Sequence, residues 1–520
     1  MAEPAVIDLK SCEAWLGRTP LADARQACSA LTALLESLQE SPPRDGAYLE
    51  ILERLREPIV VALFERSKKF SSRPLPLIES EREAFHQVLD LWRSLGNAYR
   101  HLFMALTENS GAHPELRGQG ALLAQRALDC VVDLMLSHYR CRRELDPELW
   151  QDLHALHRIV DQAGFAQQEV SVGRKSKSVS SAAEVYARAL LLALANPYAL
   201  SARELTWARR WSAKWAYKVQ FSNDGKDCYT VNPQGNTPPA WAAKPPPNVF
   251  CVDAAEVRRS IRSRLKKLDA GETAESLGLG NDCVQPQCSD LLQTLARAWT
   301  EQPTTRQFHR RATPSAAKLS TSFEAIHVAI TGRIFKDTAK QWSYARRHDT
   351  EDLYSYHGAA QAQSSAAVAL DAENWEILDE SATGFRVRRP AGQGQRLSQE
   401  QLVALRPDDG SSFILCDIRW LMTGIDESLS VGLSVLPGVA KGIAIRPLAA
   451  PDKPAEAYTQ AFMLPRTPAG AATLIIPIGV FQGGRMIEAR IDDELKRIQL
   501  CEHLQRGFDY DRASFVFAEN

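Results

Sequence analysis

The spacing of apolar residues changes along the chain, and this change limits the possible folds more than any other feature. Up to about residue 215, apolar residues recur at steps of three and four, the spacing that gives an α-helix one apolar face. Residues 20–40 illustrate it, with Leu31, Leu35 and Leu38 on one stripe. The same pattern recurs in residues 47–64, 81–107, 117–139, 146–162 and 180–195. Residues 1–215 are therefore predicted to form an α-helical domain, and the short connections favour an antiparallel array.

Two helices in this region carry start signals. Asp146 precedes Pro147, which suits an N-cap followed by the first helical position. Ser201 stands three residues before Glu204, which is the spacing of a capping box. Both positions are predicted to begin helices.

Residues 216–303 have a mixed pattern. Alternation in residues 217–221, a turn at 223–225 and a second apolar run at 229–231 predict a β-hairpin. A Pro-rich stretch follows and excludes helix there. Helices are predicted over 254–270 and 283–300. The first has a basic face between residues 258 and 267, which is typical of a solvated surface; contact with RNA or an acidic partner is the alternative.

From residue 304 onward the pattern becomes that of short strands. Strand-length apolar or alternating runs occupy residues 323–330, 375–378, 384–388, 413–421, 430–435 and 442–445. Gly, Asp and Pro turns separate them, which predicts an antiparallel barrel or sandwich over 304–450. A polar, Ala/Ser/Gln-rich insert interrupts it at 338–371. Residues 451–520 are predicted to form a small β-rich region with a short helix before its closing strand, so the fold class is multidomain α+β.

Composition narrows the functional classes. The 62 Lys and Arg residues balance 63 Asp and Glu, which argues against a general binder of nucleic acid. No window approaches the 18 apolar residues needed to cross a bilayer, and the first twenty residues lack a signal-peptide pattern. The ten cysteines are scattered along the chain. We therefore expect reduced, mostly buried thiols, no membrane insertion and a cytoplasmic protein.

Two short motifs bracket the first strand region. One is Arg306-Gln-Phe-His-Arg310, followed by Arg311, and the other is Asp379-Glu-Ser381-Ala-Thr-Gly384. Arginine offers planar, bidentate hydrogen bonds to phosphate oxygens and to the O6/N7 edge of guanine. A carboxylate accepts from a guanine amino edge, a hydroxyl donates to a phosphate, and a glycine permits close backbone approach. Together the motifs suit a compact anion that carries purine rings.

Each motif also has a plainer interpretation. The three arginines by themselves are typical of a solvated basic linker between domains. The segment 379–384 by itself is typical of a turn in which Asp and Ser side chains bond to the backbone. The joint occurrence of the two motifs and the order of the later strands favour ligand binding.

Residues 304–450 resemble the PilZ-domain family of cyclic di-GMP receptors. Arg306 and Arg310 match its RxxxR motif, and Asp379, Ser381 and Gly384 match its DxSxxG motif. The resemblance implies a six-stranded antiparallel barrel. It also implies that the arginines clamp phosphates and guanine edges of the dinucleotide, while Asp379 and Ser381 hold a guanine and its phosphate from the barrel surface.

The later strands agree with this family, and the spacing of the motifs departs from it. A strand containing Ile418-Arg-Trp420 and then one beginning Gly432-Leu follow in the family's order. The motifs are separated by the 68 residues from 311 to 378, a few tens more than is usual in the family. The insert at 338–371 accounts for the excess if it is a loop, and it either covers the ligand or occupies its place.

The sequence shows no convincing catalytic set. A Walker loop, a GxGxxG after a strand, a GxSxG and an HExxH are all missing from it, as are the GGDEF and EAL runs of enzymes that make or degrade cyclic di-GMP. The prediction is a non-enzymatic cyclic di-GMP receptor without cofactor or metal, whose helical region binds a protein partner. The alternative is a PilZ-like scaffold that no longer binds nucleotide and acts through protein–protein interaction.

Overall fold

A computed structural model describes residues 6–109, 111–171, 178–223, 225–303, 311, 314–333, 335, 372–392, 394–448, 456–468, 470–492 and 494–518. The chain divides into two compact units. One comprises Met1–Arg73 and Leu77–Thr305, and the other Pro74–Pro76 and Arg306–Asn520. No helix of the described residues is long and apolar enough to cross a bilayer.

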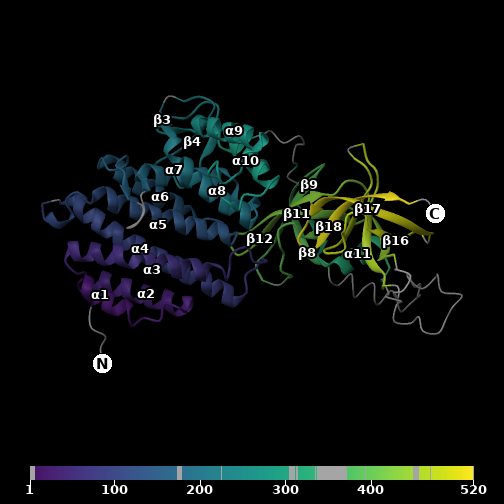
Figure 1. The fold of residues 1–520 in the computed structure, drawn as a ribbon, viewed down its shortest axis with the longest axis horizontal. Helices are drawn as coiled ribbons and strands as arrows, with labels where there is room; N and C mark the ends of the chain where they lie inside the picture. Colours follow the sequence, from purple (N-terminus) through teal and green to yellow (C-terminus); the bar gives the residue numbers. More distant parts are fainter. Residues whose placement is uncertain are drawn as a thin grey trace. The chain divides into compact units, whose positions relative to one another are not determined.

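The first unit is mainly a stack of helices (Figure 1). They are α1 (Leu9–Leu16), α2 (Ala24–Glu40), α3 (Asp45–Ser67), α4 (Glu79–Glu108), α5 (Gly120–Arg140), α6 (Pro147–Gln162), α7 (Ala182–Leu194) and α8 (Ala202–Trp215). Helix α5 is buried over most of its length and packs against α4, α6 and α7. Asp146 accepts from the Glu148 N–H, and Ser201 forms the capping box with Glu204, which confirms both predicted starts.

Buried charges also connect these helices. Asp129 of α5 accepts from Arg56 of α3 at 2.5 Å and from Arg188 of α7 at 2.7 Å. Arg126, one turn earlier, forms a bidentate pair with Glu53 of α3. Because each buried charge has an opposite charge within hydrogen-bonding distance, the cost of removing it from water is offset.

A small sheet follows the helices, and its order corrects the predicted hairpin. It contains β3 (Gln220–Ser222), β4 (Cys228–Val231), β5 (Ala240–Ala242) and β6 (Phe250–Asp253), in the order β3-β6-β4-β5. Strand β6 lies between β3 and β4, so these two do not pair with each other. Gly225 does not close a tight turn but lies against Cys251, whose Sγ would be 2.2 Å from an added Cβ. A short pair, β1 (Val170–Ser171) and β2 (Val179–Ser180), precedes α7.

Four cysteines form disulfides, which corrects the expectation of reduced thiols. The Cys228–Cys251 bond joins β4 to β6. The Cys283–Cys288 bond closes a short loop between α9 (Ala255–Asp269) and α10 (Gln287–Ala298). The first pair is 23 residues apart in sequence, and only the sheet order brings its members together. The free cysteines are buried except Cys501.

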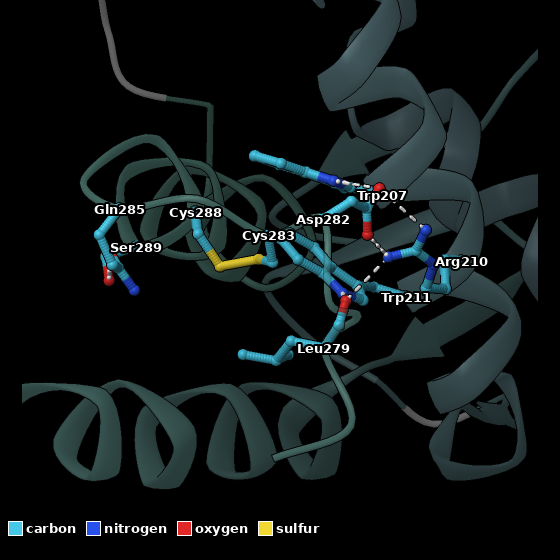
Figure 2. Close-up of a disulfide and its surroundings, with 9 residues drawn as sticks. All are labelled: Trp207, Arg210, Trp211, Leu279, Asp282, Cys283, Gln285, Cys288 and Ser289. Atoms are coloured by element: carbon cyan, nitrogen blue, oxygen red, sulfur yellow. Dashed lines mark hydrogen bonds and ion pairs between the residues drawn. A yellow bond between two sulfur atoms is a disulfide. The ribbon is translucent and has the colours of Figure 1, made fainter. Parts of the chain in front are cut away.

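Helix α8 holds the loop before the second disulfide (Figure 2). The Trp207 indole donates to Asp282 at 3.0 Å, and the Trp211 indole donates to the Leu279 carbonyl at 3.0 Å. Arg210 bonds both the Leu279 carbonyl and the Asp282 carboxylate. The Arg210 hydrogen bond lowers the pKa of Asp282 to about 2. The loop is thus fixed to the helical array by side chains from one face of α8.

The second unit contains two closed antiparallel barrels, in agreement with the predicted fold class. The first barrel comprises β7 (Ser315–Ser320), β8 (Glu373–Ser381), β9 (Gly384–Arg389), β10 (Leu402–Pro407), β11 (Ile414–Thr423) and β12 (Leu429–Val435). Its strands close in the order β10-β11-β12-β9-β8-β7.

The second barrel comprises β13 (Lys441–Pro447), β14 (Thr459–Leu464), β15 (Thr473–Pro477), β16 (Met486–Ile491), β17 (Glu494–Arg506) and β18 (Tyr510–Phe517), in the order β13-β14-β15-β18-β17-β16. Strand β13 pairs with β14 and β16, whereas the sequence pattern groups it with the earlier strands. The predicted short helix before the closing strand is wrong, because these residues belong to the long strand β17.

One predicted strand is a helix. Residues Phe323–Thr331 form α11, which begins at Ser322, whose side chain accepts from the Ala325 N–H. A short apolar run has no period that separates strand from helix, so only packing decides. Helix α11 packs against β7 and β10 of the first barrel and against β13 and β14 of the second. Its Ile326 is part of a core to which both barrels contribute.

Candidate functional site

The DxSxxG motif forms the β8–β9 hairpin of the first barrel. Ser381 and Gly384 are cross-strand partners, and the Ser381 hydroxyl donates to the Gly384 carbonyl at 3.2 Å. An added Cβ on Gly384 would lie 2.3 Å from the backbone oxygen of Leu433, on the neighbouring strand β12. The glycine is therefore required by the close approach of two strands, and both motif residues have a structural role in addition to any contact with a ligand.

Asp379 is held on the outer face of this hairpin. A bulge separates it from Ile377, and its cross-strand partner is Arg386. The carboxylate accepts from the Arg386 Nε at 2.6 Å, and the exposed fractions of the two side chains are 13% and 45%. Arg386 therefore fixes the direction of the carboxylate and remains accessible itself.

Trp420 extends this arrangement across two further strands. Arg386 pairs with Gly432 of β12, and Gly432 pairs with Trp420 of β11. Because direct cross-strand partners share a face, Asp379, Arg386, Gly432 and Trp420 form one outer row. The indole covers Gly432 so closely that an added Cβ would lie 2.0 Å from its Nε1. The outer row thus presents a carboxylate, a guanidinium and a flat aromatic ring in sequence.

Arg311 connects the arginine motif to this row. Its N–H donates to the Glu380 carbonyl at 3.0 Å, and the Glu380 N–H donates to its carbonyl at 3.1 Å. This bridge places the backbone of Arg311 beside the residue between Asp379 and Ser381, and its side chain is exposed. Arg306 and Arg310 lie outside the described residues, as does the insert at 338–371, so the predicted arginine clamp stays a prediction.

A second ion pair lies on the same hairpin. Arg388, two residues after Arg386, pairs with Asp426 in the turn before β12. Hydrogen bonds from Ser428 and the charge of Arg388 lower the pKa of Asp426. The outer face around Asp379 therefore carries Arg386 and Arg388, each paired with a carboxylate, and the exposed Arg311 lies beside the neighbouring Glu380.

Sequence reasoning did not assign Arg386, Arg388, Trp420 or Gly432 to this site. Arg386 lies two positions after the motif glycine, and nothing in its local sequence distinguishes it from a solvated strand residue. Trp420 and Gly432 were used in the sequence analysis only to compare the order of the strands with that of the PilZ family. Their pairing depends on the register of β11 against β12, which a single sequence does not disclose.

Comparisons with known proteins match two parts of the chain. A family model described as the N-terminal domain of the cyclic-di-GMP receptor FimW matches residues 10–226. A second model, described as the FimW C-terminal beta-barrel domain, matches residues 443–518. No curated protein matches the chain. The first match corresponds to the helical array and the second to the second barrel. The residues of the outer row fall between the two matched ranges in the sequence and belong to neither. The chain is thus similar, over these two ranges, to the N-terminal and C-terminal domains of the FimW family of cyclic-di-GMP receptors.

Proposed function

We propose that the chain is a non-enzymatic receptor that binds cyclic di-GMP on the outer face of the first barrel, which then acts as a PilZ-like domain. The observation that carries this proposal is the bridge between Arg311 and Glu380, which puts Arg311, the residue after the arginine motif, beside the residue between Asp379 and Ser381 in the chain. Similarity of two parts of the chain to domains of a cyclic-di-GMP receptor family supports the choice of ligand.

The outer row supplies complementary groups for a guanine base. The Asp379 carboxylate is an acceptor for the ring and amino N–H groups of guanine. The Trp420 indole is a stacking surface for a base, and such stacking contributes about 1–3 kcal/mol per base. Arg386 keeps Asp379 in place and is itself a donor for the O6/N7 edge or a phosphate.

The arginine motif would close on the ligand from the other side. Arg306 and Arg310 would then contact phosphates and guanine edges, next to Arg311. The boundary between the two compact units falls between Thr305 and Arg306. Ligand contact at these arginines would therefore act on the connection between the units and pass the signal to the helical region and its protein partner. The ligand shifts the equilibrium between the free and liganded arrangements because it makes different contacts in the two.

Calorimetric titration of the full chain with cyclic di-GMP tests this function. We expect saturable binding that is weakened about tenfold or more by Asp379→Asn or Arg310→Ala, because each removes a charge-assisted hydrogen bond. Lys318→Ala is the matched control, since Lys318 pairs with Asn374 near the opposite end of β8. Cyclic di-AMP should bind far more weakly because adenine lacks the N1–H and 2-amino donors that would reach Asp379, and carries an amino group in place of O6. Absence of heat with folded protein at tens of micromolar refutes the proposal.

One observation favours the alternative of a scaffold without nucleotide. The Asp379 carboxylate is already engaged by Arg386 in the unliganded chain. If Asp379 stays paired with Arg386 and never contacts a nucleotide, the outer row is a rigid surface to which a protein partner binds. In that case Arg386→Ala leaves nucleotide binding absent and weakens only capture of the partner.

A further inference from the structure

A separate cavity lies at the junction of the two barrels. Its volume is about 500 Å³, and three segments line it. The end of α11 contributes Thr331 and Arg333, and the end of β16 contributes Arg490. The start of β13 contributes Lys441 and Gly442. None of these residues belongs to the outer row or to either sequence motif.

Cationic groups dominate the polar wall of this cavity. Among the residues that the structure describes, Arg333, Lys441 and Arg490 line it together with the Asp492 carboxylate. Lys441 pairs with Asp492, and both side chains remain about half exposed, at 45% and 66%. A concave surface with more cations than carboxylates concentrates anions, and guanidinium groups match the geometry of phosphate.

Part of the lining is apolar. It is formed by Ile330 at the end of α11 and by Val439 and Ala440 in the linker from the first barrel to the second. The Val439 side chain is 85% exposed, unusual for a residue in the middle of a tightly connected unit. The lining therefore offers contacts both to an apolar body and to an anionic group.

The cavity depends on a specific close contact. An added Cβ on Gly442 would lie 2.3 Å from the Cγ2 of Thr331 and 3.1 Å from the Nε2 of His327. Gly442 thus allows α11 to lie directly on β13 and form one wall. Since α11 also packs on β7 and β10, a ligand here would contact the second barrel and a helix that packs on both barrels.

We propose that this cavity is a second ligand site and that it binds a small organic phosphate with an apolar or aromatic body, such as a mononucleotide. The volume lies within the range of about 300–1,000 Å³ that is usual for small-molecule sites. The phosphate would be held by Arg333, Lys441 and Arg490. This inference does not depend on the function proposed for the outer row.

Titration of the full chain with GMP tests the proposal. The chain carries Asp379→Ala, so that binding at the outer row is weakened. We expect saturable binding at one equivalent, and weakening of about tenfold by Lys441→Glu or Arg490→Gln. Lys496→Glu is the matched control, because Lys496 also pairs with a carboxylate, Glu494, on the second barrel and does not line the cavity. The Lys496→Glu variant should bind GMP with the same affinity as the Asp379→Ala chain that carries no further change.

A comparison with guanosine tests whether the phosphate is recognised, and hydrogen exchange tests where GMP binds. Guanosine lacks the phosphate and should bind at least about tenfold more weakly than GMP. GMP should slow amide exchange in a peptide that spans residues 437–445. Lys441→Glu places a carboxylate beside Asp492, and this repulsion could itself disturb the fold. Arg333→Gln therefore provides a second variant, at an exposed side chain, that adds no negative charge. No saturation at millimolar GMP, equal losses with Lys496→Glu, or equal affinity for guanosine overturns the proposal.

Discussion

Two glycines of the first barrel should respond in opposite ways to the same substitution. In Gly384→Ala the new methyl group would meet the backbone oxygen of Leu433 at 2.3 Å. In Gly432→Ala it would meet the Trp420 indole, whose Nε1 is 2.0 Å away. A backbone oxygen within a paired strand is unable to move without breaking the ladder, whereas an indole on the outer face is free to rotate.

The magnitudes follow from these neighbours. Overpacking against a fixed backbone costs about 1–3 kcal/mol, and each kcal/mol lowers Tm by about 2–4 °C in a unit of this size. Gly432→Ala should cost less than about 1 kcal/mol in stability, but it moves the indole out of the outer row. Loss of one stacked base, about 1–3 kcal/mol, weakens cyclic di-GMP binding roughly 5- to 150-fold.

Thermal unfolding and calorimetric titration of both variants provide the assay. Gly384→Ala should lower Tm measurably, while Gly432→Ala should keep Tm and lose affinity. Trp420→Ala should lose a similar amount, and the double variant should lose no more than Trp420→Ala alone because both changes remove the same contact. Equal Tm for the two glycine variants, or full affinity in Gly432→Ala, refutes this reasoning.

Two further predictions concern the first unit. Replacing each disulfide by a pair of serines should destabilise the unit, by about 3 kcal/mol for Cys228–Cys251 and about 2 kcal/mol for Cys283–Cys288. The difference arises because the unfolded chain gains more entropy when the longer loop is opened. Urea unfolding measures both free energies, and the reverse order contradicts the explanation. The lowered pKa of Asp282, about 2, means that its stabilising contribution is present above pH 4 and is lost as the pH falls toward 2. Asp282→Asn should therefore reduce the loss of stability between pH 4 and pH 2, as followed by urea unfolding, and an unchanged loss would argue against it.

The helical part of the fold could be predicted closely from the sequence. Long amphipathic stretches and local caps such as Asp146 and Ser201 depend only on neighbours three or four residues away, and the structure confirms them. Short apolar or alternating runs also predict β8, β9, β11, β12 and β13, whereas β7, β10 and β14 were not predicted individually. What failed was the choice between helix and strand for residues 323–330, because a short apolar run fits either and its burial between two barrels decides.

Features that depend on non-local pairing could not be predicted. The order β3-β6-β4-β5 and the Cys228–Cys251 bond arise when β6 inserts between two strands that are closer in sequence. In the candidate site, Asp379, Ser381 and Gly384 were found through their local motif. Arg386 and Trp420 were missed because only cross-strand register brings them to Asp379.

The central claim is that cyclic di-GMP binds between the arginine motif and the outer row. Hydrogen–deuterium exchange of the full chain, with and without saturating cyclic di-GMP, tests it most directly. The account predicts slower exchange in peptides that cover residues 304–311, 379–386 and 417–423, and unchanged exchange in residues 456–477 of the second barrel. Exchange that is unchanged throughout, or slowed only outside the first barrel and its arginine motif, would contradict it.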